Sequence, residues 1–502
     1  MQIKMIVVML LAVLISATGL AESATTSSIS QHGITWNFDT AYEYGQFANG
    51  DYWVVGPVTI TSIIPEYDAG TQRNGWEVNP VVDGNQGFDG RVGTGTFDSR
   101  LILRLPYTSG QNIESIVKVI SAAESSVSYV QTAAVLTVLT EMPTNNGSTV
   151  FRPPYMGTTK PLYGIGDLHT EYLPSLASVG SPPSLATVES RYRYLRLEHM
   201  TYDQRSIRPR NAYGGVSDGY APDCTKHNAD DIARLCLNDS LNDKMDALVS
   251  VTQHGIDQAY AVIGGMRSPG TGHDPGHALM AAFAAVMLDI TEAKTVLQSA
   301  TGFEEDNYIT KIADVSLWGQ TNTETAYWDY IRGGGGNRAN RDPYGLIDGG
   351  GCGAAYQLVV SQNCKGTVLI GDLIPEIASQ AWNPTTWANL EEYVARWVNT
   401  GVWAQPDPCA PVGGTYGVDY GPDPDDTPYD CILDDDVDYF NSIDDWACTD
   451  GQNCGRFPSN HGTYADGGQY KSDFVADMWD AYYDGSVYHG APPRPTNLRI
   501  IE

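Results

Sequence analysis

The sequence predicts a mainly α protein: an (α/α) toroid or barrel with an N-terminal β-hairpin region and long, disulfide-stapled loops. Three observations predict this fold class. Helical runs recur between residues 111 and 401, the stretch at 277–290 is apolar nearly all round, and long Gly- and Pro-rich loops separate the runs. A helix that is hydrophobic on every side is expected to be buried, and paired helices with loops at one end provide that burial.

Residues 31–106 are expected to be mainly extended. The segments ITWNFD, YWVVGPVTITSII and RLILRLP are rich in β-branched and aromatic residues, which favour strands. Turn residues at 49–51 separate the first two segments. We interpret this part as a β-hairpin region packed on the main body. The alternative is a separate sugar-binding module whose tryptophans would stack on sugar rings.

From residue 111 onward the spacing of apolar residues becomes helical. Residues 112–125 fit a helical spacing, residues 130–142 fit a strand or a helix, and residues 186–200 are expected to be helical. A stronger helix is predicted to follow a cap at Asp239 or Ser240.

The helix with the clearest signals covers residues 384–400. Asn383 is its expected cap, Pro384 occupies the first turn, and Gly401 lies just past its end. This arrangement of proline at the start and glycine after the end is typical of helices.

One large architecture is expected for the 502 residues, because no low-complexity linker interrupts them. Residues 1–21 are expected to be a signal peptide, with Lys4 ahead of an apolar core too short to span a bilayer. We therefore expect a secreted or periplasmic protein. The rest divides into a β-rich region at 22–110, the toroid at 111–402, and an acidic, cysteine-containing loop region with the C-terminal segment at 403–502.

The eight cysteines indicate an oxidising compartment. Their connectivity cannot be read from the sequence, and pairing of near neighbours is our hypothesis. The pairs would be Cys224 with Cys236, Cys352 with Cys364, Cys409 with Cys431, and Cys448 with Cys454. No paired CxxC spacing indicates a thiolate metal site.

The formal charge of −31 argues against binding of nucleic acid or of anionic membranes. It also opposes a polyanionic substrate, but much of the acid lies near the C-terminus whereas six arginines gather within residues 191–210. Because salt screens distant charges most, a local basic cleft is compatible with the acidic body. No cofactor is expected to be required. A structural calcium ion could bind the aspartates at 423–436, although a solvated acidic loop is the alternative. A monomer is expected.

Several segments in order resemble bacterial toroid lyases of polysaccharide lyase family 38, which act on alginate and glucuronan. The segments are HGITWNFD, YGQFANGDYWVVGPV, RPRNAYGG, QHGID, GTGHDPGH, FEEDNY, CGAAY and ANLEEYVARW. The likeness covers most of residues 32–400. It implies an (α/α) toroid and β-elimination on an anionic, uronate-containing polymer such as alginate, poly-mannuronate or glucuronan.

The catalytic candidates lie in these segments. The resemblance implies Tyr308 as the proton donor, and Asn211 is our candidate for neutralising the substrate carboxylate. His254 precedes Gly255 at an expected helix break and would act as base or neutraliser. His273 would face the cleft. The structural alternatives are a turn asparagine at 211, a helix-terminal histidine at 254 before Gly255, and a partly buried tyrosine at 308.

Further side chains are candidates for binding the substrate. They are Arg208, Arg210, Tyr213, Asp257, Arg267, His277 and Glu305. His273 and His277 have the spacing of two metal ligands on a helix, but Pro275 between them argues against that helix. We therefore predict no metal at the site.

Two other functions remain open from the sequence. An inverting glycoside hydrolase would need two carboxylates, which could come from Asp257 and residues 304–306. A non-catalytic glycan-binding protein would also fit the acidic charge and the many tyrosines. No GxSxG, P-loop or strand-linked GxGxxG motif indicates an esterase or a nucleotide-dependent enzyme.

Overall fold

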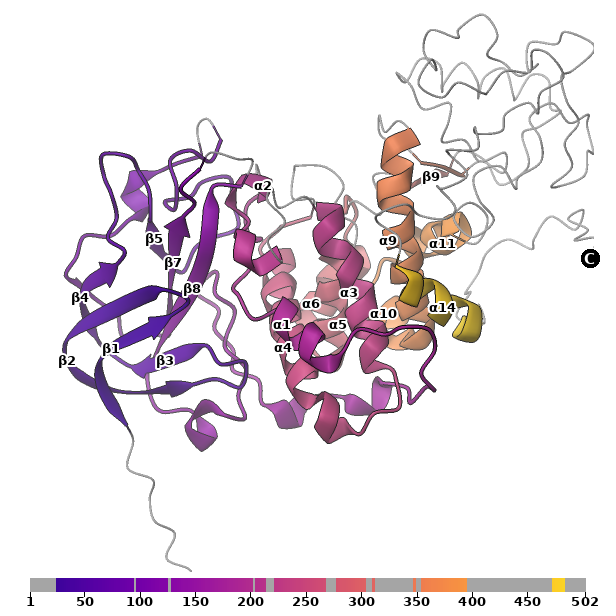
Figure 1. Cartoon of the computed structure of the whole chain (residues 1–502), viewed down its shortest axis with the longest axis horizontal. Helices are drawn as coiled ribbons and strands as arrows, with labels where there is room; N and C mark the ends of the chain where they lie inside the picture. The colour runs from indigo at the N-terminus through magenta and orange to yellow at the C-terminus, as the bar shows by residue number, and fades with distance from the viewer. Residues whose placement is uncertain are drawn as a thin grey trace, which may run out of the picture.

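A curled, mixed β-sheet lies beside a group of helices in the computed structural model of this chain (Figure 1). The structure describes residues 24–93, 96–124, 128–201, 204–213, 221–267, 277–303, 309–311, 346–348, 354–394 and 472–483. Because the structure combines this curled sheet with helices, the predicted mainly α toroid is wrong. The sheet extends well past residue 110, because the apolar segments at 114–121 and 130–139 form strands.

The main sheet has eight strands, in the order β5-β7-β8-β3-β2-β4-β6 with β1 paired to β2. All neighbours are antiparallel except β3 and β8, which run parallel. Its strands are β1 Thr25–Gln31, β2 Ile34–Gln46, β3 Tyr52–Val55, β4 Thr59–Ile64, β5 Trp76–Val78, β6 Tyr107–Thr108, β7 Glu114–Ser121 and β8 Val130–Leu139. A separate pair is formed by β9 (Ile309–Lys311) and β10 (Leu346–Asp348).

Both faces of β8 are buried. Ala133 and Val135 belong to the large core shared with the helices, whereas Ala134 and Leu136 belong to the core enclosed by the curled sheet. Successive side chains of a strand point to opposite faces, and a strand covered on both sides reads as a continuous apolar run. This explains why residues 130–142 fitted either a strand or a helix.

The helix predicted at 112–125 is wrong for the same reason. Residues 114–121 of that segment form β7, which pairs with β5 and β8. Because Ile116 and Val117 are buried on opposite faces, the strand also has apolar residues at helical spacing. The predicted strands in ITWNFD and YWVVGPVTITSII are confirmed by β2, β3 and β4. The segment RLILRLP instead contains the end of a short 3-10 helix, Ser99–Leu101.

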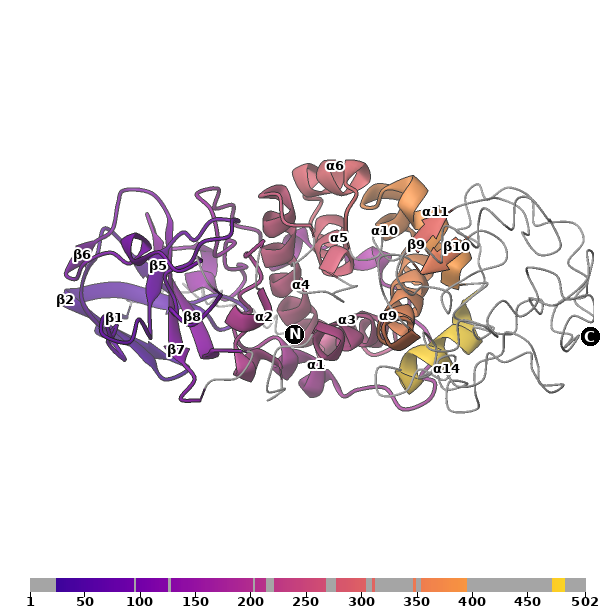
Figure 2. The ribbon, with the colours of Figure 1, turned by 90° about the horizontal axis from the view of Figure 1, so that it is seen from above.

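The helices follow the sheet in sequence and lie beside it in both views (Figures 1 and 2). Helices α9, α10, α11 and α14 lie on the side of α3, α4 and α5 that faces away from the sheet. The described helices are α1 Leu185–Arg191, α2 Gln204–Ile207, α3 Ala221–Leu235, α4 Leu241–Ile263, α5 His277–Met287, α6 Thr291–Ser299, α9 Ala354–Leu373, α10 Pro375–Gln380, α11 Pro384–Tyr393 and α14 Asp473–Tyr482.

Two predicted helix starts are confirmed. Ser240 caps α4 by accepting a hydrogen bond from the backbone N–H of Asp243, and Asn383 caps α11 through Thr385 and Thr386. The helix predicted at 186–200 is only partly correct, because α1 ends at Arg191.

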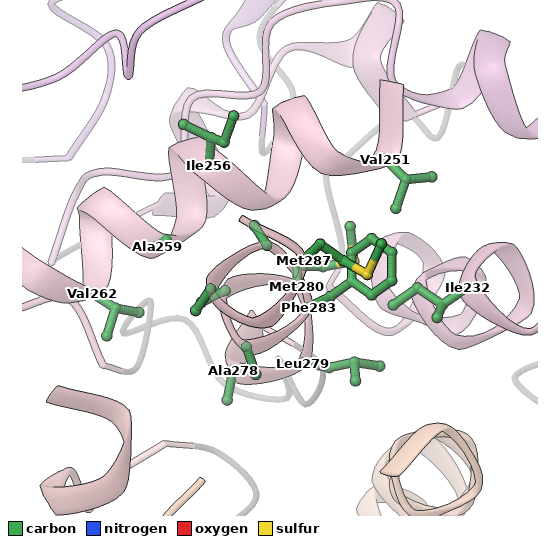
Figure 3. Close-up of a cluster of buried hydrophobic side chains, with 14 of the residues drawn as sticks. Ile232, Val251, Ile256, Ala259, Val262, Ala278, Leu279, Met280, Phe283 and Met287 are labelled. Atoms are coloured by element: carbon green, nitrogen blue, oxygen red, sulfur yellow. The ribbon is translucent and has the colours of Figure 1, made fainter. Parts of the chain in front are cut away.

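Helix α5 is surrounded by α3, α4, α6 and α10, as its all-apolar sequence predicted (Figure 3). Residues 278–287 are all buried. Its contact with α4 is close at Gly255, where an added Cβ atom would lie 2.7 Å from both the Cβ atom of Ala284 and the backbone oxygen of Met280. Gly255 therefore permits close helix packing, whereas the sequence had suggested a helix break at this position.

We expect Gly255→Ala to destabilise the protein by about 1–3 kcal/mol, because the added methyl group overpacks the α4–α5 contact. Urea unfolding would measure the change. Gly166→Ala is the matched control, since nothing lies within 4 Å of a Cβ atom built there. Equal stability of the two variants would contradict the close-packing role of Gly255.

A second buried feature lies inside the sheet region. Glu77 of β5 is 4% exposed and accepts a hydrogen bond from the backbone N–H of Gly87 at 2.5 Å. Burial raises the pKa of the Glu77 carboxyl to about 8. The carboxyl is thus protonated in the folded protein across a pH range in which it ionises in the unfolded chain.

Glu77 should make the free energy of unfolding fall as the pH rises. The stabilisation from its protonated carboxyl is fully present below about pH 4.5 and is lost as the pH rises to about 8, because the unfolded chain releases this proton at lower pH than the folded protein does. We expect Glu77→Gln to remove up to about 4 kcal/mol of the stability difference between pH 5 and pH 8. Unfolding in urea at both pH values tests this. A variant with the same pH slope as the parent protein would refute it.

Among the predicted disulfides, the described residues test the pair of Cys236 with Cys224. Cys236 is a buried free thiol in this structure, so the pairing with Cys224 is not present. The proposed partner of Cys364, and both members of the remaining two pairs, lie outside the described residues.

In the part of the chain that the structure describes, no helix is long and apolar enough to cross a membrane.

Candidate functional site

A small cavity lies where the sheet region meets α4. It is lined by the β2–β3 turn at Asn49 and Asp51, by Arg152, by residues 192–196, and by the side of α4 that carries His254. Its free volume is about 10 Å³, which is room for about one water molecule. Polar and charged groups dominate its lining, in contrast to the apolar cores on either side.

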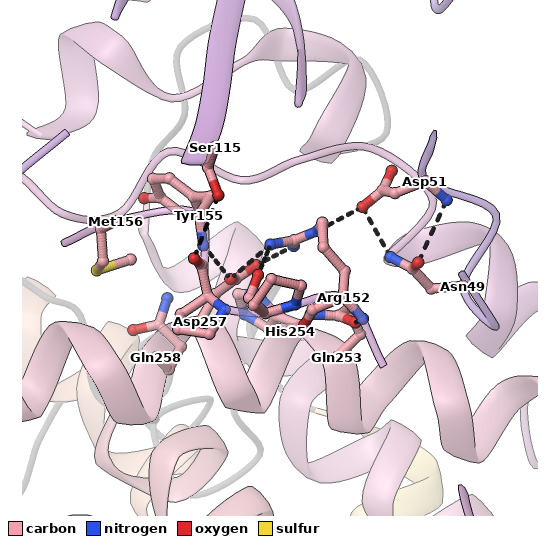
Figure 4. A network of polar contacts seen from close by, with 12 residues as sticks. Asn49, Asp51, Ser115, Arg152, Tyr155, Met156, Gln253, His254, Asp257 and Gln258 are labelled. Atoms are coloured by element: carbon pink, nitrogen blue, oxygen red, sulfur yellow. Dashed lines mark hydrogen bonds and ion pairs between the residues drawn. The ribbon is translucent and has the colours of Figure 1, made fainter. Parts of the chain in front are cut away.

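Arg152 joins the parts that line this cavity (Figure 4). Its side chain is 2% exposed and lies between two carboxylates. The Nε atom donates to Asp51 Oδ2 at 2.6 Å, and the terminal nitrogens donate to Asp257 Oδ1 and Oδ2 at 3.1 and 2.5 Å. Burial alone would lower the pKa of Arg152, but the two carboxylates raise it above its usual value.

Gln253 reinforces the same junction. Its Oε1 atom accepts from the backbone N–H of Arg152 at 2.8 Å, and its Nε2 atom donates to the backbone oxygen of Arg152 at 3.0 Å. Gln253 and Asp257 are four residues apart, so they lie on one face of α4. The two side chains hold that face against residue 152, with His254 between them in sequence.

We expect Arg152→Met to destabilise the protein by about 3–5 kcal/mol, because the change leaves Asp51 and Asp257 as buried carboxylates without their common cation. Thermal or urea unfolding would measure the loss. Arg100→Ala serves as the control, since that arginine is 89% exposed in its ion pair with Asp98 and should show no measurable change. A loss as small as that of the control would show that the buried triad does not hold the junction.

His254 is 7% exposed and lies inside α4. The prediction that it lies at a helix break is wrong, because Gly255 continues the helix. Its ring stacks on Tyr192 with a centroid distance of 5.3 Å. Its Nε2 atom lies 3.7 Å from Glu198 Oε2, and Glu198 Oε1 lies 3.7 Å from Arg208 Nε. The imidazole is thus positioned between an aromatic ring and a buried carboxylate.

Glu198 is held in place by hydrogen bonds from its own backbone to Tyr155 and from Gln258 to its carboxylate. The Tyr155 hydroxyl accepts from the backbone N–H of Glu198 at 3.0 Å and shares a hydrogen bond of 2.9 Å with Nδ1 of His199. Burial lowers the pKa of His199 to about 3, so this ring is neutral and can accept at Nδ1. Gln258 of α4 also donates to Glu198.

Arg193 lies at the mouth of the cavity. It is exposed and lines the same cavity as His254. Its guanidinium has no carboxylate partner among the described residues, whereas Arg191 pairs with Asp231 and Arg152 with two aspartates. Arg196 is buried beside it, with its guanidinium 4.6 Å from the centre of the Tyr192 ring.

The structure brings together some of the candidates from the sequence. His254 and Asp257 line the cavity. Arg208 does not line it, but Glu198 links Arg208 to His254. Asp257 is 5% exposed and bound by Arg152, so it acts as a structural partner in this arrangement. Arg208 is fully buried.

Other candidates are placed away from the cavity lining. Asn211 is exposed and accepts from Gln131 Nε2 of β8 at 2.7 Å. Arg210 donates to the backbone oxygen of Ser128. Arg267 donates to the backbone oxygens of Val262 and Met266 just past α4.

The remaining candidates are not described at the side-chain level. His277 begins α5, and Tyr213 ends the short 3-10 helix Arg210–Tyr213. Tyr308, His273 and Glu305 lie outside the described residues. The acidic loop at 423–436, which was considered for a calcium ion, also lies outside them. Where the structure is described, no group of three metal-ligating side chains is assembled.

Sequence reasoning missed Tyr192, Arg152 and Glu198. Two of them lie in the segment RYRYLRLEHM, where charged and apolar residues alternate. That alternation indicates an extended segment with one polar side, and such a segment could have been read as a candidate lining. Arg152 carries no comparable signal, because its partners are about 100 residues away in either direction.

Comparison of the chain with protein-family models, with curated proteins and with solved structures found no match.

Proposed function

We propose that this protein is a polysaccharide lyase that cleaves a uronate-containing polymer by β-elimination. One observation carries the proposal: the exposed guanidinium of Arg193, which has no carboxylate partner among the described residues, lines the same cavity as His254. The arginine provides a binding group for an anion, and the histidine provides a group that transfers protons near neutral pH.

β-Elimination requires three events. The substrate carboxylate is neutralised, the proton on C5 moves to a base, and the electrons of that bond form the C4–C5 double bond as the C4–O bond breaks. The leaving oxygen then takes a proton. In our proposal Arg193 binds the carboxylate, with Arg196 adding positive charge, and His254 takes the C5 proton. The donor to the leaving oxygen is Tyr308, as the sequence suggests.

The small volume of the cavity restricts the binding mode. Because it holds about one water molecule, the sugar ring is proposed to lie across its mouth, beside Arg193. Glu198 supports the role of His254, since a carboxylate 3.7 Å from Nε2 favours the protonated ring that forms during the reaction.

Ultraviolet absorbance of unsaturated products tests the proposal. Purified protein would be screened against alginate, its poly-mannuronate and poly-guluronate blocks, glucuronan and ulvan. We expect absorbance to rise with at least one of them. His254→Gln should lower kcat by about 10²–10⁴-fold, and Arg193→Ala should raise KM by about tenfold because it removes a charged hydrogen-bond donor.

Arg100→Ala is the control for the loss of an exposed arginine elsewhere and should leave KM unchanged. Far-ultraviolet circular dichroism would confirm that each variant is folded. Release of saturated reducing ends from a neutral glucan would exclude the lyase, and equal KM values for Arg193→Ala and Arg100→Ala would exclude Arg193 as the carboxylate-binding group.

A further inference from the structure

We propose that the protein has a second ligand site, a surface groove that binds an uncharged oligosaccharide. The groove consists of two adjoining hollows of about 460 and 360 Å³, which share Ile113 just before β7. We call it the Ile113 groove. None of its lining residues lines the cavity of His254, so the two sites are distinct.

The size of the Ile113 groove suits a chain of sugar units. Each hollow falls within the roughly 300–1,000 Å³ that is typical of ligand sites. Because the hollows meet at one residue, a ligand that fills both must be extended. The cavity beside His254, with about 10 Å³, offers no comparable room.

The groove has an apolar floor and apolar rims. Leu139 and Val150 in its lining are buried in a small core cluster with Trp53. Met142 and Leu162 also line it, and they are 41% and 42% exposed. Large apolar side chains exposed around one hollow often mark a binding surface, and the C–H faces of a sugar ring can pack against such side chains.

The charged groups of the groove are mostly occupied within the protein. Lys160 is its one basic lining residue, and its ammonium donates to Ser115 Oγ at 2.9 Å and to the backbone oxygens of Pro154 and Met156 at 2.7 and 3.2 Å. These contacts use all three donors of a lysine. An anionic polymer would therefore find no available cation there.

Two of the three acidic lining residues also accept hydrogen bonds within the protein. Glu114 accepts from the Tyr107 hydroxyl at 2.8 Å and from the backbone N–H of Gly110 at 3.0 Å, and Asp167 accepts from the backbone N–H of Gly164 at 2.7 Å.

The exposed polar groups of the lining include one amide, three hydroxyls and two carboxylates. They are Asn112, Thr140, Thr144, Thr158, Glu141 and Asp167. Such acceptors and donors match the hydroxyls of a neutral sugar, and a uronate polymer would meet an acceptor-rich, negatively charged surface. The chemistry of the groove therefore selects uncharged glycan over the polyanion proposed for the His254 cavity.

Isothermal titration calorimetry with the full chain tests the proposal. The probes are β-1,4-linked hexasaccharides of glucose, mannose and xylose, each titrated to millimolar concentration. We expect at least one to bind. The double variant Met142→Ala/Leu162→Ala should bind it about tenfold more weakly, because the apolar rim is removed. Val81→Ala/Leu103→Ala removes two exposed apolar side chains that do not line the groove and should bind it as the parent protein does.

The outcomes separate this site from the proposed lyase site. Binding that persists in His254→Gln and weakens only in the groove variant supports the proposal, whether or not the protein cleaves a uronate polymer. Absence of binding by all three hexasaccharides overturns it. Equal weakening in both double variants, or displacement of the hexasaccharide by poly-mannuronate, also overturns it.

Discussion

The ion triad of Arg152 with Asp51 and Asp257 is the interaction on which the site depends. It joins a turn of the sheet, the segment at residue 152 and helix α4 within a few ångströms. A buried ion pair contributes little net stability compared with an apolar replacement. Removal of only one partner is costly, because the other charge is then buried without a counter-ion. The triad therefore specifies how the sheet and α4 meet, and the apolar cores on both sides supply most of the stabilisation.

This junction also explains why polar chemistry gathers at one place. Charged side chains are tolerated in the interior only when they are paired and hydrogen-bonded. Around α4 they form a connected set, in which Glu198 links Arg208 with His254 and Gln258. Arg193 differs, because it is exposed at the edge of this set without a carboxylate partner among the described residues. That contrast is the basis for proposing an anionic substrate there.

The two proposed sites complement each other in charge. One has an available guanidinium next to a histidine, and the other has amides, hydroxyls and apolar rims around Ile113. The chain carries a net charge of −31, so an anionic polymer is attracted only where a local cation outweighs the distant field. An uncharged glycan is not subject to that restriction.

Local signals in the sequence determined several elements by themselves. Ser240 and Asn383 cap their helices because a side-chain oxygen next to an apolar-periodic run satisfies the first free N–H groups. The apolar run at 278–287 is buried all round because it has no polar side to expose. Only the tertiary structure decided that residues 114–121 and 130–139 are strands, since burial on both faces gives a strand and a buried helix the same composition. It also decided the site: Arg152 finds Asp51 and Asp257 about 100 residues away, and no local pattern encodes contacts at that separation.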